Sequence, residues 1–300
     1  MRIFDRALVR KRRDRAAPRF AAHDFLVREV AERLADRLDD VTRSFPMALD
    51  LGCHTGEIAG TIGKRGGIKT LVQCDLSPRM AAMAAGNGNP TLVADEEWLP
   101  FAPASFDLVI SCLSLHWVND LPGTLVQIRR ALKPDGLFLA AVLGAGTLAE
   151  LRRSLMEAEL AEEGGVSPRV SPFADVRDLG GLLQRAGFAL PVVDCDSVSV
   201  SYADPMRLMA DLRGMGESNA VVEQRKTLTR RATLLHAISA YQSGFAAGDG
   251  RLPATFQVMT LTGWAPVPGH AAPPPPLPRL ADGYGGGLGC GGDRNPADKS

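Results

Sequence analysis

Short apolar runs alternate with amphipathic segments between residues 23 and 143. The segment at about 23–40 predicts a helix, and the apolar runs at 47–51, 68–75, 91–94 and 105–110 predict buried strands. Alternation of this kind is typical of a parallel sheet with helices on both faces and ligands at the carboxyl ends of the strands. The sequence therefore predicts an α/β, Rossmann-like, doubly wound and mostly parallel sheet, with an N-terminal helix and a C-terminal elaboration.

The first predicted strand runs into a glycine-spaced turn, LDLGCHTG at residues 49–56. Gly52 and Gly56 let the backbone pass close to a ligand, and Asp50 ends the strand facing the crevice. The helix that follows offers free N–H groups to a polar ligand. The turn lacks the third glycine of the dinucleotide fingerprint and the Gly-Lys-Ser/Thr of a phosphate loop, so NAD and ATP are disfavoured.

Acidic residues end the next two predicted strands. Asp75 lies 25 residues after Asp50, near the roughly 20-residue interval at which an acid meets a ribose in such folds. Asp95, followed by Glu96, ends the third strand and is a candidate for the edge of an adenine. The crevice is thus expected to hold a nucleoside-like ligand.

Six motifs in order carry a family resemblance: LDLGCHTG, VQCDLSPRM, ADEEWLPF, SFDLVISCLSLHWVND, IRRALKPDGLFLAAV and LLQRAGF. Over about residues 45–195 the chain resembles the class I S-adenosylmethionine-dependent methyltransferases. The resemblance implies S-adenosyl-L-methionine as cofactor, with the glycine loop near its methionine end, Asp75 on the ribose and Asp95 near the adenine. The cofactor-binding residues expected from the pattern and the resemblance are Asp50, Gly52, His54, Gly56, Asp75, Leu76, Asp95, Glu96 and Ser111, with no metal.

His54 departs from the family pattern, because the loop commonly reads D-x-G-x-G-x-G and His54 replaces the middle glycine. A left-handed backbone is uncommon for histidine, although it is less costly than for a β-branched residue. Two interpretations follow: a harmless substitution whose imidazole points to solvent, or a side chain that narrows the cofactor site or joins the chemistry. The first is preferred.

Further segments extend the resemblance to about residues 2–264, among them RIFDRALVRKRRDRAA, EEGGVSPRVSPFADVRDLG, DLRGMGESN and LPATFQVMTLTGW. They are similar to the mitochondrial complex I assembly factor subgroup and its bacterial relatives, which is described as a protein arginine hydroxylase on a methyltransferase fold. A more distant resemblance is to the malonyl carrier-protein methyltransferase of biotin synthesis. Fold alone does not choose among these chemistries.

Three functions remain open. Methyl transfer to a protein or carrier-protein-bound substrate comes first, because it needs only the cofactor that the motifs imply. Arginine hydroxylation of a complex I subunit is the alternative; oxygen insertion generally needs a metal or redox cofactor, and no two-His-one-carboxylate pattern is legible. The third is a non-catalytic complex I assembly chaperone. In each case the expected partner is a protein, with a complex I subunit as the candidate.

The loop at 111–119 is expected to face the substrate. His116 is a candidate for proton transfer and Trp117 for a wall of the pocket or a catalytic role, although packing is an alternative for both. The resemblance to the complex I assembly factor subgroup implies that the segment at 146–175 forms part of a lid over the substrate. A glycine break precedes polar residues at 217–219. The candidate substrate-binding residues are Arg152, Arg169, Glu217, Ser218 and Asn219.

Composition is that of a protein without a charge bias. Lys plus Arg and Asp plus Glu both number 34, which gives no case for nucleic acid. No apolar run approaches the roughly 20 residues of a transmembrane helix. The five cysteines form no C-x-x-C pair, which suits reduced thiols. The expected compartment is the cytoplasm of a bacterium, or alternatively the mitochondrial matrix at the inner membrane; oligomeric state is not predicted.

The two ends of the chain differ from its middle. Residues 1–44 form a basic helical segment with eight Lys or Arg among the first 19 positions. A solvated helix capping the fold, a contact surface for an acidic partner and a targeting segment are the three interpretations. Residues 45–200 are expected to form the cofactor-binding domain and 201–264 a lid or elaboration. Residues 265–300, with eight Pro and eight Gly, are expected to be a disordered tail.

Overall fold

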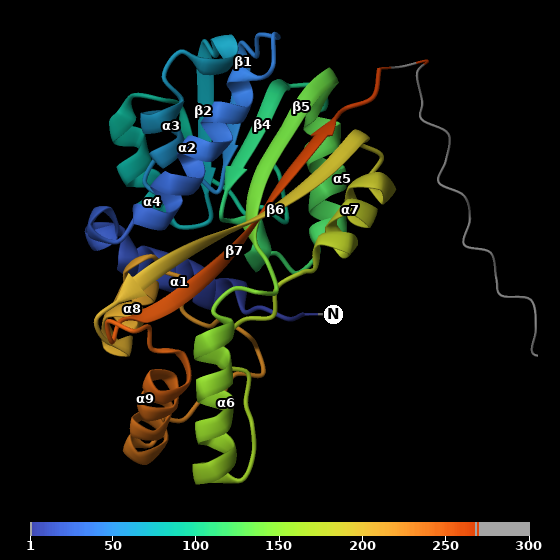
Figure 1. Cartoon of the computed structure of the whole chain (residues 1–300). Coiled ribbons are helices and arrows are strands. Elements are labelled where there is room, and N and C mark those ends of the chain that lie inside the picture. The colour runs from blue at the N-terminus through green and yellow to red at the C-terminus, as the bar shows by residue number, and fades with distance from the viewer. Residues whose placement is uncertain (1, 268, 270–300) are drawn as a thin grey trace, which may run out of the picture.

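The computed structural model describes residues 2–267 and 269. The predicted tail at 265–300, with Cys290, lies almost wholly outside the described residues. In the described part of the chain, a seven-stranded sheet has the order β3-β2-β1-β4-β5-β7-β6 (Figure 1). The strands are β1 (Met47–Leu51), β2 (Thr70–Asp75), β3 (Thr91–Val93), β4 (Phe106–Cys112), β5 (Leu132–Leu143), β6 (Ala189–Tyr202) and β7 (Leu252–Trp264).

The first five strands pair in parallel, and β7 pairs antiparallel with both β5 and β6. The predicted mostly parallel α/β sheet is therefore confirmed. Strand order reverses between β1 and β4, because the chain runs outward from β1 through β2 to β3 and then returns to the other side of β1. In open α/β sheets, ligands bind at the carboxyl ends of the strands beside such a reversal.

Helices cover both faces of the sheet because residues within each strand alternate between the faces. On β4, Leu108 and Ile110 pack with helix α2, whereas Val109 packs with helices α5 and α7. The covering helices are α2 (Phe25–Asp39), α3 (Glu57–Ile62), α4 (Pro78–Ala84), α5 (Leu121–Ala131) and α7 (Val176–Arg185), with short 3-10 turns at Ala17–Ala22, Arg65–Gly67, Ala85–Asn87 and Leu115–Trp117.

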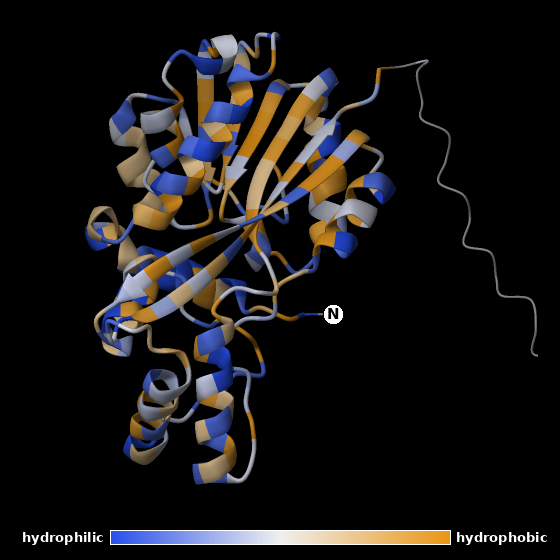
Figure 2. Cartoon of the chain, viewed as in Figure 1, coloured by the Kyte–Doolittle hydropathy of each residue, from blue (hydrophilic) through white to orange (hydrophobic). Residues whose placement is uncertain are grey.

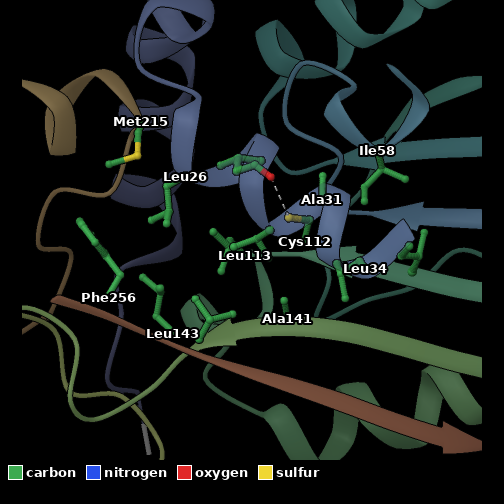
Figure 3. Close-up of a cluster of buried hydrophobic side chains, with 14 of the residues drawn as sticks. Leu26, Ala31, Leu34, Ile58, Cys112, Leu113, Ala141, Leu143, Met215 and Phe256 are labelled. Carbon is green, nitrogen blue, oxygen red and sulfur yellow. Dashed lines mark hydrogen bonds between the residues drawn. The ribbon is translucent and has the colours of Figure 1, made fainter. Parts of the chain in front are cut away.

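Figure 2 shows apolar residues concentrated along the central strands. Figure 3 shows the core on the α2 face, where Leu26 and Leu34 meet residues of β4, β5 and β7. The Cys112 thiol lies in this core and donates to the Val27 carbonyl oxygen at 3.5 Å. Cys53 and Cys74 are also buried free thiols, as expected for small packing residues.

The region at 201–264 is more than a lid. The expected boundary at residue 200 falls inside β6, and residues 252–264 form β7, which lies between β5 and β6. Helix α8 (Pro205–Gly214) follows β6, while α6 (Ala149–Glu163) and α9 (Arg231–Phe245) pack together and project beyond the sheet (Figure 1). No helix in the described residues has the length and apolar character needed to cross a bilayer.

Helix α1 (Arg6–Ala16) passes beneath the carboxyl ends of the strands (Figure 1). Asp5 caps it by accepting a hydrogen bond from the backbone N–H of Leu8. Although the helix is strongly basic, Arg6 and Arg13 are buried. The helix caps the fold, as one of the three interpretations has it, and Arg10, Lys11 and Arg15 are exposed. It is not solvated throughout, because Arg6 and Arg13 find carboxylate partners inside the protein.

Candidate functional site

The glycine turn closes tightly after β1. Gly52 has φ +74° and Gly56 has φ +101°, a left-handed backbone that favours glycine. A Cβ on Gly52 would lie 2.1 Å from Ser114 Oγ. The turn therefore touches the loop that follows β4, and it leaves no room for a larger residue at position 52.

His54 crosses the crevice between β1 and β4. Its backbone is left-handed, with φ +49°, and the residue is only 2% exposed. The ring Nε2 lies 2.9 Å from the carbonyl oxygen of Cys112, and the ring stacks on Phe20 with 5.5 Å between centroids. The solvent-facing interpretation of His54 is wrong, because the turn directs its imidazole inward and narrows the crevice.

Asp75 lies at the centre of the crevice and is completely buried. Its Oδ2 accepts hydrogen bonds from the His54 backbone N–H at 3.1 Å and from the Arg13 guanidinium at 3.2 Å. Its Oδ1 accepts from the backbone N–H of Ser77 at 2.7 Å. Protein donors therefore already bond both carboxylate oxygens that the resemblance assigns to a ribose.

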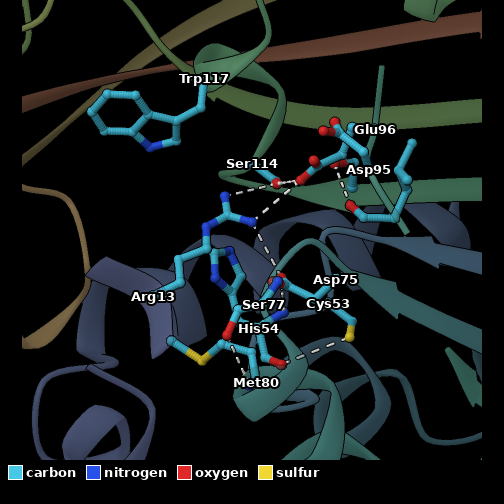
Figure 4. A network of polar contacts seen from close by, with 12 residues as sticks. Arg13, Cys53, His54, Asp75, Ser77, Met80, Asp95, Glu96, Ser114 and Trp117 are labelled. Atoms are coloured by element: carbon cyan, nitrogen blue, oxygen red, sulfur yellow. Dashed lines mark hydrogen bonds and ion pairs between the residues drawn. The ribbon is translucent and has the colours of Figure 1, made fainter. Parts of the chain in front are cut away.

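Arg13 reaches two further residues of the crevice (Figure 4). Its guanidinium donates to Glu96 Oε1 at 3.2 Å and to Ser114 Oγ at 2.9 Å. Ser114 Oγ in turn donates to the same Glu96 oxygen at 2.6 Å. Arg13 is 1% exposed, which is rare for an arginine unless its charge is paired.

Arg6 completes the ion-pair network from the other end of α1. It donates to Asp95 Oδ1 at 2.6 Å and forms an ion pair with Glu96. Burial alone would raise the pKa of Glu96, but the charges of Arg6 and Arg13 and the hydrogen bond from Ser114 outweigh it and lower the pKa to about 2. Glu96 is therefore ionised at neutral pH.

With α1 in this position, an adenosyl group would compete with protein donors for the polar groups of the crevice. Guanidinium groups bond the carboxylates assigned to its ribose and adenine, while His54 and Ser114 close over the glycine turn. Leu76 packs in the same cluster as Phe4 of the N-terminal segment. The Ser111 hydroxyl donates to the Leu51 carbonyl oxygen at 2.7 Å and ties β4 to β1.

Asp50 is a buried carboxyl group with few partners. Its only side-chain contact is a long 3.5 Å hydrogen bond from Gln73 Nε2, and its Oδ1 has no partner among the described residues. Burial, which the bond from Gln73 only partly offsets, raises the pKa of Asp50 well above its usual value. Asp50 thus sits beneath the glycine turn as a poorly satisfied acid.

The loop after β4 brings His116 and Trp117 to a third acid, Glu217. His116 Nε2 lies 3.0 Å from Glu217 Oε2, and the Trp117 indole N–H donates to the same carboxylate at 3.0 Å. Burial would raise the pKa of Glu217, but His116, Arg13 and the indole N–H lower it below its usual range. The carboxylate is ionised and its orientation is fixed.

Glu217 lines a cavity of about 370 Å³ between the sheet and the α6 region. The walls are mainly apolar side chains, among them Leu143, Leu151 and Phe173, and the polar lining includes Ser218 and Asn219. The cavity therefore combines apolar walls with the ionised Glu217 carboxylate and the guanidinium groups of Arg169 and Arg213.

Comparisons with known proteins place the fold in a family. Residues 49–140 match the model of the methyltransferase domain. The chain is 45% identical over 277 residues to the mitochondrial arginine-hydroxylase NDUFAF5 of Danio rerio, with 91% of this chain and 86% of that protein covered. The human protein of the same name is 48% identical, with 88% and 77% covered. This chain belongs to the methyltransferase-domain family.

Other members of this family diverge in activity. The malonyl-[acyl-carrier protein] O-methyltransferase of Methylovorus sp. (strain MP688) is 36% identical, with 90% of this chain and 93% of that protein covered. The structure of YcgJ from Bacillus subtilis has a TM-score of 0.53 at 15% identity, covering 78% of this chain and 97% of that one. The solved structure supports the fold alone, whereas the relatives carry two different named activities.

Most of the predicted site residues of this methyltransferase-domain chain lie at two adjoining sites, the crevice at the carboxyl ends of the strands and the cavity lined by Glu217. Asp75, Asp95 and Glu96 surround the crevice, while Glu217 joins it to the cavity through His116 and Trp117. Arg169 lines the cavity but pairs with Glu159 at 2.6 Å.

Arg152 takes no part in the cavity that Glu217 lines. Its guanidinium donates to the carbonyl oxygens of Ala145 and Thr147, and it lines a separate cavity of about 570 Å³. The predicted substrate set is thus divided, with Arg152 bracing the start of the lid segment instead of facing the same space as Glu217.

Sequence reasoning missed Arg6, Arg13 and Ser114 as residues of the site. Arg6 and Arg13 lie seven residues apart with Val9 between them, so they share one face of α1 with a buried apolar residue. Arginines on the apolar stripe of a helix are the signal that would have found them. Their carboxylate partners are 62 to 90 residues away, so the sequence did not name the acids they bind.

Proposed function

We propose that this chain hydroxylates an arginine side chain of a partner protein, on a methyltransferase fold. The proposal is supported by identities of 45–48% to arginine hydroxylases over 88–91% of the chain, against 36% to the malonyl-carrier methyltransferase. Methyl transfer, the first expectation from the motifs, becomes the second candidate.

The observation that carries the proposal is the ionised Glu217 carboxylate on the wall of an apolar cavity. An arginine side chain has an aliphatic stem and a planar cation, so apolar walls accept the stem and a carboxylate binds the guanidinium. Glu217 already accepts from His116 and Trp117, which hold it in place while leaving acceptor capacity on its two oxygens.

The chemistry of this proposal balances with two co-substrates. Inserting one oxygen atom into a C–H bond consumes dioxygen, two electrons and two protons, and it releases water. The electrons come from a reductant of the two-electron class. The residues of this chain bind and orient the arginine, and Glu217 is the group that fixes its guanidinium.

Methyl transfer is supported by the family and by the retained acids of the crevice, Asp75 and Asp95. A malonyl-type carboxylate would meet Arg169, whose charge is paired with Glu159 and whose Nη2 has no hydrogen-bond partner among the described residues. The exposed Arg213 also lines the cavity. A protein substrate is preferred to a carrier-bound acid because the identity to the arginine hydroxylases is higher, and a subunit of respiratory complex I is the candidate partner.

A mass-spectrometric comparison of whole proteomes tests the proposal. Strains lacking the gene would be complemented with the wild type, with Glu217→Gln or with the exposed control Glu157→Gln. We expect one or more arginine-containing peptides to gain about 16 Da only in the wild-type and control strains. A gain of about 14 Da would instead establish methyl transfer, and no mass change in any strain would leave the chaperone hypothesis.

A further inference from the structure

The N-terminal helix fills the crevice that its family uses for a ligand. Arg13 bonds Asp75, Glu96 and Ser114 (Figure 4). Arg6 bonds Asp95 and Glu96. We propose that α1 is a displaceable latch: it holds the crevice shut through Arg6 and Arg13, and it must move away before an adenosyl ligand binds.

The carboxylates that the latch occupies are suited to such a ligand. Asp75 follows β2 and Asp95 follows β3, at the carboxyl ends of neighbouring parallel strands. Carboxylates at these ends are natural acceptors for ribose hydroxyls and base N–H groups. Arg13 and Arg6 therefore compete with the ligand for the same acceptor atoms, so occupancy by α1 and by the ligand are mutually exclusive.

Contacts of the segments before and after α1 in the chain hold the helix in the crevice. Before the helix, the Asn119 side chain accepts from the backbone N–H groups of Ile3 and Phe4 at 2.8 and 2.7 Å. After it, Phe20 stacks on His54. Because the arginines are tethered beside their acceptors, an incoming ligand competes against a high effective concentration of guanidinium groups.

The latch also contacts the segment that carries Glu217. Arg12 donates to the Ser218 carbonyl oxygen at 2.6 Å. The backbone N–H of Asp5 donates to the Ala220 carbonyl oxygen at 2.9 Å. Arg13 packs against Gly216 as well. Movement of α1 is thus transmitted directly to residues 216–220, which connect the crevice to the cavity.

Calorimetric titration of the full chain with S-adenosylhomocysteine tests the latch. The variants are Arg13→Ala and the control Arg10→Ala, which removes an exposed arginine one turn earlier on the same helix. If the wild-type crevice is open about 1–10% of the time, its apparent Kd is weakened ten- to a hundredfold. We therefore expect Arg13→Ala to bind about ten- to a hundredfold more tightly than the wild type, and Arg10→Ala to match the wild type.

A measurement on the wild type keeps the test valid if Arg13→Ala fails to fold. Saturating S-adenosylhomocysteine should accelerate amide hydrogen exchange in α1 while exchange in α5 stays unchanged. Equal affinities for wild type and Arg13→Ala would overturn the latch, as would unchanged or slower exchange in α1. Absence of binding to either protein would also overturn it, because the crevice would then not be a site for this ligand.

Discussion

The imidazole Nε2 of His54 lies 2.9 Å from the backbone carbonyl oxygen of Cys112. The contact joins the turn after β1 to the end of β4, the two strands between which the strand order reverses. A ligand at the carboxyl ends of these strands has to pass this ring. His54 is therefore a second closure of the crevice beside the arginines of α1, and it shares the acceptor Asp75 Oδ2 with Arg13.

Replacing His54 by glycine should loosen this closure. We expect His54→Gly to lower the free energy of unfolding by about 1–3 kcal/mol, because a buried ring and its hydrogen bond are lost. The same variant should gain more thermal stability than the wild type from S-adenosylhomocysteine, since ligand binding to the folded state raises its stability.

The measurement is a thermal melt with and without ligand, and His54→Asn is the matched variant. Asparagine tolerates a left-handed backbone but is smaller than histidine, so an intermediate ligand-dependent shift is expected. A His54→Gly shift no larger than that of the wild type would show that the ring does not limit access.

Glu217→Gln should weaken the binding of an arginine-containing substrate. Glutamine has the size of glutamate but no charge, so the charge-assisted bond to a substrate guanidinium is lost. We expect the KM for an arginine-containing substrate to rise at least about tenfold, equivalent to 1.4 kcal/mol. The melting temperature should also fall, because His116 and Trp117 lose a charged acceptor, so the KM is measured well below it.

The control for this variant is Glu157→Gln, on the exposed side of α6. Steady-state kinetics on the modified peptide would measure both. A change in kcat at constant KM would assign Glu217 to the chemical step instead of to guanidinium binding.

The alternating pattern of the first half was sufficient to predict the sheet. Asp75 ends β2 as predicted, whereas Asp50 lies one residue before the end of β1 and Asp95 two residues after the end of β3. The position of β7 between β5 and β6 was missed, since β7 begins more than a hundred residues after β5 ends. Such a pairing depends on long-range contacts that no local pattern specifies.

Burial of charge was the other feature that local reasoning missed. Arg6 and Arg13 belong to a segment with eight basic residues, so composition favoured a solvated helix. Their burial is tolerated because Asp75 and Glu96 pair with them. Likewise, the left-handed backbone expected at His54 was right, but the direction of its ring depended on Phe20 and Cys112.

Asp50→Asn should stabilise the folded protein at neutral pH. The pKa of Asp50 is raised in the folded state, so the folded protein holds the carboxyl proton more tightly than the unfolded chain does. The resulting contribution to the free energy of unfolding is complete below the unfolded pKa, near 4. It is lost as pH rises through the folded pKa. At about pH 7 the wild type therefore bears an unfavourable acid, and the amide should add about 1–2 kcal/mol to the free energy of unfolding.

Urea unfolding of Asp50→Asn at several pH values measures this effect. The exposed control Asp196→Asn should leave stability and its pH dependence nearly unchanged. Equal stability of Asp50→Asn and wild type at about pH 7 would mean that the carboxyl group has favourable partners which the buried contacts do not reveal.

Acid should release the network around α1 through Glu96. The folded pKa of Glu96, about 2, lies below the unfolded value of 4.5. The contribution of the ionised carboxylate to the free energy of unfolding is therefore present above the unfolded pKa, and it is lost as pH falls through the folded pKa. For a shift of this size the contribution is on the order of 3 kcal/mol. We expect the wild type to lose stability steeply between about pH 5 and pH 2, as urea unfolding would measure.

Glu96→Gln should be less stable at neutral pH, because Arg6 and Arg13 lose a buried partner, and its stability should fall less on acidification. A Glu96→Gln curve parallel to that of the wild type would place the acid-sensitive group elsewhere.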